Sequence, residues 1–134
     1  MISNKHITVV ASVIVAIAVA AGLYVSGSPG EQRLLRLDEK RLSDLLQLSY
    51  AISNYWDEAE RLPAGLSALV DGQRLRGVPA DPESGAMYIY EPGAMDAYRL
   101  CAEFARASIQ RVPDDFWAHE AGRQCFALEA GPER

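Results

Sequence analysis

The sequence predicts an α+β protein in which a long amphipathic helix packs on a small antiparallel β-meander. Three observations support this class: an uncharged apolar run near the N-terminus, helical spacing of apolar residues over residues 31–62, and aromatic, β-prone segments after residue 85. The 134 residues suffice for one small domain with appendages and not comfortably for two. We therefore expect a single folded domain that follows a membrane-type segment.

Charge is divided sharply along the chain. All 18 acidic residues lie at or after Glu31, whereas Lys5 alone among the 13 Lys and Arg residues precedes it. A formal net charge of −5 without a basic cluster excludes a general nucleic-acid binder, because phosphate contacts need grouped Lys and Arg. The hydrophobic share of 49% is ordinary for a globular protein and excludes a disordered chain.

Residues 7–25 carry no charge over 19 positions, enough to cross a hydrocarbon core of roughly 30 Å as a helix. A cleaved signal peptide is the alternative, because Ser26 and Gly27 offer a small-residue cleavage site. We expect a transmembrane helix that contacts the lipid bilayer, with residues 1–6 as a short cytoplasmic tail. Gly and Pro in residues 26–30 break the helix and predict a hinge or linker.

Two signals bear on the orientation of this span. Four basic residues between positions 33 and 41 follow it closely and favour a cytoplasmic C-terminus by the positive-inside rule. The very short N-terminal tail and the two cysteines instead favour an oxidising compartment for the rest of the chain. We expect a single-pass protein of the bacterial inner membrane, with residues 31–134 as a periplasmic domain.

Residues 31–62 place apolar side chains mostly three or four apart, which predicts a long amphipathic helix. The wide apolar stripe suits a helix lying along a sheet. A dimeric coiled coil is the alternative, and Asp38 and Arg41 interrupt the sustained heptad that it needs. Pro63 ends the helix, and the apolar spacing in residues 64–70 predicts a short second helix.

The remainder of the chain has the character of a small sheet. Residues 77–85 are dense in Pro, Gly and Asp and predict tight turns. Residues 86–91 and 97–104 are β-prone and are joined by turn residues 92–96, which predicts a β-hairpin. Residues 124–128 predict a third strand, so the sheet is an antiparallel meander.

Cys101 and Cys125 have the same parity on the second and third strands, so both thiols share a face if those strands are neighbours. Neighbouring strands could bring the two thiols close enough to form a disulfide. Two free buried thiols and a metal site are the alternatives. Zinc needs four ligands, and His119 is the nearby candidate imidazole. We expect a disulfide, with no metal and no cofactor.

Several motifs follow one another in a fixed order. The apolar span and the long helix are followed by LPxxLxxL at residues 62–69 and by DPxxGxxYxY at residues 81–90. This order resembles the type IV pilins and type II secretion pseudopilins, whose long helix packs on a small antiparallel sheet. Residues 98–101 and 119–126 resemble uncharacterised bacterial membrane-anchored proteins of the same layout. The resemblance implies a pilin-like domain.

The N-terminal segment differs from that of processed pilins. Those proteins carry a Gly-Phe-type peptidase site and a Glu at the fifth mature position, whereas this chain begins MISNKHITVV and has no acidic residue before Glu31. We therefore expect an ordinary, uncleaved membrane anchor on a pseudopilin-like domain.

Two groups of residues are candidate sites. Asp81, Pro82 and Gly85 predict a structural turn in which the Asp carboxylate accepts backbone amide hydrogens. Phe116 and Trp117 form a bulky pair in an irregular segment, so they are either an exposed anchor for a protein partner or part of the core.

His119 beside Glu120 supports an alternative, a small enzyme or ligand-binding domain with the imidazole as a base. The sequence has no HExxH, GxSxG or phosphate-loop motif to supply the other groups, which favours a turn residue. We expect a non-enzymatic protein that acts in protein–protein interaction or envelope assembly. Its expected partners are envelope proteins, in a homo-oligomer or as an accessory subunit of a larger membrane complex.

Overall fold

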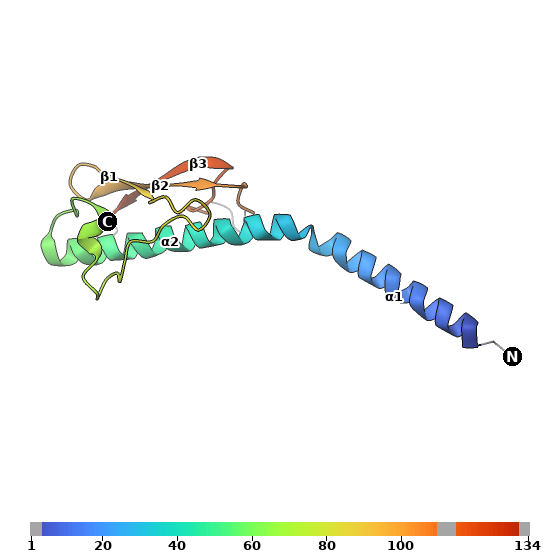
Figure 1. Ribbon diagram of the computed structural model, residues 1–134. Helices are drawn as coiled ribbons and strands as arrows, with labels where there is room; N and C mark the ends of the chain where they lie inside the picture. Colours follow the sequence, from blue (N-terminus) through green and yellow to red (C-terminus); the bar gives the residue numbers. More distant parts are fainter. Residues whose placement is uncertain (1–3, 110–114, 132–134) are drawn as a thin grey trace. The chain divides into compact units, whose positions relative to one another are not determined.

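The computed structural model describes residues 4–109 and 115–131 (Figure 1). The chain divides into two compact units, the first ending at Arg33 and the second beginning at Leu34. Its helices precede a small antiparallel sheet, which confirms the α+β class. The elements are α1 (Asn4–Ser26), α2 (Pro29–Ala59), the 3-10 helix η1 (Leu66–Leu69), β1 (Ile89–Pro92), β2 (Ala97–Phe104) and β3 (Gly122–Glu129).

α1 contains the whole predicted span of residues 7–25, while residues 1–3 of the predicted tail lie outside the described part of the chain. The described residues hold one helical stretch long and apolar enough to cross a membrane, and it lies near the N-terminus. Its apolar side chains are exposed. Transfer of these apolar side chains from water into an apolar environment, such as the interior of a lipid bilayer, is favourable.

The predicted hinge at residues 26–30 is too long. Only Gly27 and Ser28 leave the helical conformation, and Gly27 has φ +73°, which glycine adopts without strain. The Ser28 hydroxyl oxygen accepts the Glu31 amide hydrogen at 3.2 Å, so Ser28 caps the next helix. Pro29 then opens α2, where its missing N–H is harmless. Residues that suggested a linker therefore start a helix.

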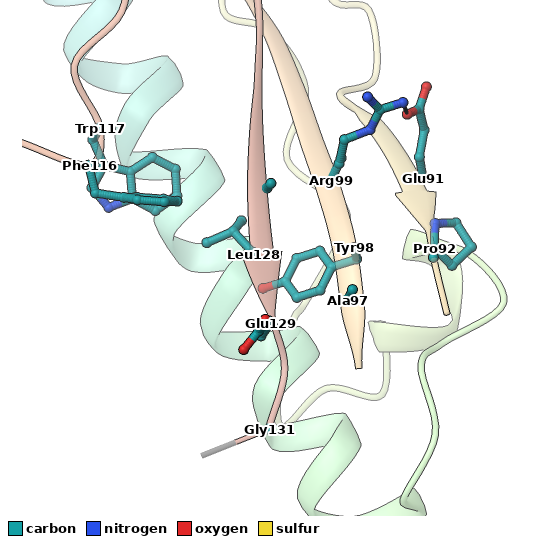
Figure 2. A pocket seen from close by; sticks show the side chains of 12 residues that line it. Glu91, Pro92, Ala97, Tyr98, Arg99, Phe116, Trp117, Leu128, Glu129 and Gly131 are labelled. Atoms are coloured by element: carbon teal, nitrogen blue, oxygen red, sulfur yellow. Dashed lines mark hydrogen bonds and ion pairs between the residues drawn. The ribbon is translucent and has the colours of Figure 1, made fainter. Parts of the chain in front are cut away.

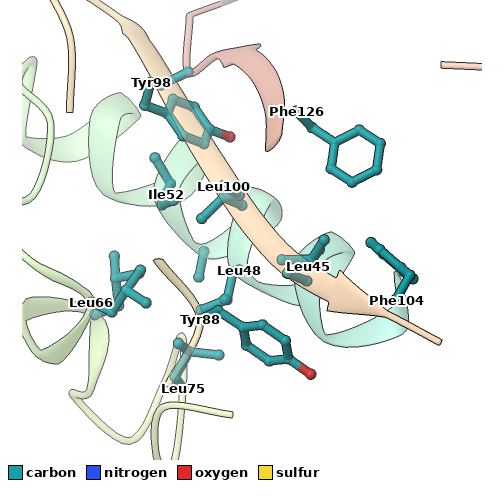
Figure 3. Close-up of a cluster of buried hydrophobic side chains, with 14 residues drawn as sticks. Leu45, Leu48, Ile52, Leu66, Leu75, Tyr88, Tyr98, Leu100, Phe104 and Phe126 are labelled. Carbon is teal, nitrogen blue, oxygen red and sulfur yellow. The ribbon is translucent and has the colours of Figure 1, made fainter. Parts of the chain in front are cut away.

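α2 lies along one face of the sheet and ends at Ala59, three residues before the predicted end at residue 62 (Figure 1). Glu60 has φ +50°, a left-handed conformation that ends the helix. Side chains from α2, η1 and β2 form one buried cluster, shown in Figure 3. Its fully buried members include Leu45, Leu48, Ile52, Leu69, Leu75 and Leu100.

The predicted helix over residues 64–70 is only the single 3-10 turn of η1. Gly65 is extended and excludes the first two predicted residues from the helix. Val70 leaves it at the other end to bridge Leu75. Tertiary contacts therefore outweigh the helical spacing in this short segment.

The sheet is an antiparallel meander in the order β1-β2-β3. β1 begins later than the predicted residue 86, because Met87 instead makes an isolated bridge with Ala80. β3 extends beyond the predicted residues 124–128 at both ends. Alternate residues of β2 are buried in the same cluster as the α2 side chains: Tyr98, Leu100, Ala102 and Phe104.

Candidate functional site

Three charged side chains of α2 are buried: Asp38, Arg41 and Asp44. A spacing of three residues places them on one face of the helix, in line with the apolar residues that follow. We call these three residues the polar strip. Charged groups are rarely buried unless they are paired, so their partners define what the strip does.

Arg41 connects α2 to the turn at residues 81–85. Its Nε and Nη2 atoms both donate to the Asp81 carboxylate, the second at 3.2 Å. Nη2 also lies 3.0 Å from Glu83 Oε2, and Nη1 lies 2.9 Å from Asp38 Oδ1. Two parallel hydrogen bonds to one carboxylate fix the orientation as well as the distance of the paired groups.

The turn itself is organised by Asp81. Its Oδ1 atom accepts the amide hydrogens of Glu83 at 3.0 Å and Ser84 at 2.8 Å, and the Ser84 hydroxyl at 3.0 Å. Pro82 lies within the turn, and Gly85 closes it with φ +72°. The three residues singled out in the sequence thus meet in one turn, which Arg41 holds against α2.

The other two members of the strip bind further segments. Asp38 accepts the amide hydrogens of Ala105 and Arg106, each at 2.9 Å, just after β2. Asp44 accepts the Tyr88 hydroxyl hydrogen at 2.9 Å and forms an ion pair with Lys40. The polar strip therefore holds three later segments of the chain against one helix.

The pKa values reflect this pairing. Hydrogen bonds from Arg41 hold the pKa of Asp81 well below its ordinary value, with further help from the backbone amides of the turn. The same contact with Asp81 raises the pKa of Arg41. Burial raises the pKa of Tyr88, and its hydrogen bond to the Asp44 carboxylate adds to the effect.

Acid is expected to destabilise the domain through Asp81. Its folded-state pKa lies below the ordinary value of 3.8, so the unfolded chain takes up the proton first. The stabilisation is present above pH 3.8 and is lost as the pH falls below it. Thermal unfolding followed by circular dichroism should show a steeper fall of Tm below this pH for the natural chain than for Asp81→Asn. Equal slopes would contradict the assignment.

A groove of about 880 Å³ lies beside the C-terminal end of β3 (Figure 2). Phe116 and Trp117 line one side, and Leu128 extends from β3 toward them. The Trp117 ring lies 4.8 Å from that of Phe126, so Trp117 packs on the core. Phe116 packs edge-on against Trp117 and remains 55% exposed. Trp117 is thus fixed by packing on the core, while the Phe116 ring beside it remains largely exposed to solvent.

Cys101 and Cys125 are joined by a disulfide across β2 and β3. They are directly opposite in the register, with their Cα atoms 4.0 Å apart. Cys101 is buried and Cys125 is exposed, on the sheet face opposite the buried Tyr98 and Leu100. The bond ties the edge strand to the central one.

His119 is held by contacts to its backbone and ring. Its amide hydrogen is accepted by Ser108 Oγ at 3.0 Å, and its carbonyl accepts the Ser108 amide hydrogen at 2.8 Å. The ring stacks on Phe104 with centroids 3.7 Å apart. A shallow pocket beside it is also lined by Glu120 and Gln124. Within residues 4–109 and 115–131, no cluster of three or more His, Cys, Asp or Glu side chains is placed to hold a metal.

The sequence interpretation missed the polar strip. It treats Asp38 and Arg41 as breaks in a heptad, whereas the structure buries both. The available signal is their position: continuing the stripe of Leu48 and Leu45 toward the N-terminus in steps of three or four reaches Arg41 and Asp38. Charges in line with a buried stripe point to a buried ion pair, although the sequence does not name their partners.

The chain matches no protein-family model, no curated protein and no solved structure. Its function is therefore inferred from its own residues: the apolar N-terminal helix, the disulfide-linked sheet and the aromatic groove.

Proposed function

We propose that this chain is a single-pass protein of the bacterial inner membrane that presents a non-enzymatic, pilin-like domain to protein partners in the periplasm. The observation that carries the proposal is the exposed apolar surface of α1, which is followed in sequence by a disulfide-linked domain. Residues 7–25 supply the membrane anchor, and residues 34–134 supply the interacting domain.

The motifs behind the pilin resemblance contribute to the junction of helix and sheet, which supports the pilin-like assignment. The Tyr90 hydroxyl donates to the Pro63 carbonyl oxygen at 3.0 Å, so the two motifs contact each other. Tyr88 donates to Asp44 of α2. Two tyrosine hydroxyls, the Pro63 carbonyl and the buried Asp44 carboxylate thus connect the start of the sheet to α2 and to the segment that follows it.

The disulfide supports the outward orientation. Structural disulfides form and persist in oxidising compartments such as the periplasm and are rare in the cytosol. The basic residues after the span oppose this orientation, but the positive-inside rule is a statistical bias and the N-terminal tail is very short. We therefore assign the disulfide-bonded domain to the periplasm.

Reporter fusions at the C-terminus test the membrane placement. Alkaline phosphatase fused to residue 134 should be active, because it needs an oxidising compartment, and green fluorescent protein fused there should stay dark. Val15→Arg, near the middle of α1, should reduce the membrane-bound fraction, since a central arginine costs about 3 kcal/mol in a span. Tyr50→Arg on the exposed side of α2 is the matched control. If the green fluorescent protein fusion were fluorescent and the phosphatase fusion inactive, the C-terminus would be cytoplasmic and the proposed orientation would be overturned.

Site-specific photo-crosslinking tests the interaction. A photoreactive residue in place of Phe116 should give a defined protein adduct in intact cells, because this ring is exposed at the groove. The same residue in place of Tyr50, which is 70% exposed on α2, is the control and should give none. Phe116→Ala should lower the free energy of unfolding by only about 1 kcal/mol, because the ring is largely exposed and packs edge-on against Trp117. Identical adducts at both positions would argue against a site at Phe116.

A further inference from the structure

β3 is the longer free edge of the sheet. Among the described residues, the order β1-β2-β3 leaves one side of β3 without a neighbouring strand. The opposite edge, β1, has four residues and ends in Pro92, whereas β3 has eight residues and no proline. A long edge without proline can pair with a further strand.

The spacing of the cysteines shows which backbone groups of β3 face this free edge. A Cα separation of 4.0 Å marks Cys101 and Cys125 as the close, non-hydrogen-bonded kind of antiparallel pair. The N–H and C=O groups of Cys125 therefore point away from β2, as do those of residues 123, 127 and 129. Within the described chain, no other segment makes a backbone hydrogen bond to these groups.

The exposed face of β3 carries one charge near each end. Arg123 is near its start and Glu129 is at its end, and both side chains are exposed. Glu129 lies opposite Ala97 in the sheet, which supplies no cation, whereas Arg123 lies opposite the acidic Glu103. Neither residue forms a salt bridge with residues 4–109 or 115–131.

These charges are complementary to those of an identical strand. When a second β3 lies antiparallel with Phe126 on the two-fold axis, Arg123 of each copy faces Glu129 of the other. The four residues whose N–H and C=O groups point away from β2 (123, 125, 127 and 129) then all lie in hydrogen-bonded pairs with the second copy. A shift of two residues places Arg123 opposite Ala127 or Gly131, which removes both charge pairs. A shift of one residue places backbone N–H and C=O groups that point away from β2 opposite groups that already bond to β2 in the other copy, so the hydrogen bonds between the copies cannot form.

We propose that two copies of this chain pair through β3 in this register and form one continuous antiparallel sheet. The inference rests on the proposed function, since it names a second copy as the partner of the interacting domain. The groove at Phe116 and Trp117 opens beside the C-terminal end of β3, where Figure 2 shows Leu128 and Glu129 next to it. Opposite charges in register stabilise such a pair and fix its alignment.

Ala127→Pro tests the backbone pairing in the full chain. Its N–H faces away from β2, so proline there spares the native ladder and blocks the outer one. Two copies with different affinity tags are co-expressed and purified together from detergent-solubilised membranes. Co-purification of the variant copies should fall about tenfold or more, with Tm unchanged. Undiminished co-purification would place the contact elsewhere in the chain and overturn the proposal.

A charge exchange tests the register independently. Arg123→Glu puts Glu opposite Glu129, and Glu129→Arg puts Arg opposite Arg123, so each variant should fail to pair with itself. Mixed together, the two variants restore both opposite-charge pairs and should co-purify like the natural chain. Glu120→Arg makes the same charge change just outside β3 and should pair normally. Failure of the mixture to pair would overturn the register.

The experiments distinguish failure of the β3 pairing from failure of the proposed function. Natural copies that never co-purify, in cells where the C-terminal phosphatase fusion is active, overturn the β3 pairing and leave the periplasmic domain standing. A cytoplasmic C-terminus overturns the proposed function, whatever the oligomeric state.

Discussion

Arg41→Met is expected to destabilise the globular domain by about 3–5 kcal/mol, the usual cost of removing one partner from a buried ion pair. Arg41 is the cation that contacts Asp38, Asp81 and Glu83 together. Without it, the two Asp carboxylates stay largely buried and lose the cation with which each forms an ion pair. Chemical denaturation of the full chain in detergent, followed by tryptophan fluorescence, measures the change.

Two further substitutions separate charge from geometry. Arg41→Lys keeps the charge but lacks the planar fork that reaches three carboxylates, so we expect an intermediate loss. Glu83→Gln removes the partner whose side chain is 50% exposed, and exposed pairs contribute about 1 kcal/mol or less. A loss for Glu83→Gln equal to that for Arg41→Met would contradict the central role of the buried contacts.

Removing the disulfide is expected to cost about 3 kcal/mol, because it closes a loop between residues separated by 24 positions and restricts the unfolded chain. The double variant Cys101→Ala, Cys125→Ser matches each replacement to its surroundings, since Cys101 is buried and Cys125 exposed. For a domain of this size the loss corresponds to a Tm lower by about 10–20 °C.

Reduction provides the control for this prediction. Adding dithiothreitol to the natural chain should lower its Tm to nearly that of the double variant, and it should leave the double variant unchanged. A Tm of the natural chain that does not respond to full reduction would show that the bond adds little stability. The folded-state circular dichroism should be similar in both, because the effect acts mainly on the unfolded chain.

The sequence predicts much of this fold because its strongest signals are local. The period of apolar residues in α2, the alternation in β2 and the Pro–Gly turns each depend on near neighbours, and the structure follows them. Helix termini are less predictable. Pro29 and Gly30 suggest a linker by composition, whereas Ser28 and Glu31 make the same residues a capped helix start.

The contacts of the polar strip lie beyond the reach of such local signals. Arg41 and Asp81 are forty positions apart, and Asp38 binds the backbone of Ala105. The sequence places Asp81 in a turn by its own chemistry, but the partner of that carboxylate depends on the packing of the helix on the sheet. The candidate site is predicted only in part for the same reason. Phe116 stands out as bulky, and its exposure follows from the packing of Trp117 on Phe126.

Asp38 also makes two loop amides into reporters of helix docking. The amide hydrogens of Ala105 and Arg106 lie beyond the end of β2, where exchange with solvent deuterium is ordinarily fast. Their bonds to Asp38 mean that exchange must wait for α2 to move off the sheet. The exchange rates of these two amides therefore report how often the helix–sheet interface opens. The amides within the sheet report a different event, because their exchange requires the strands to separate.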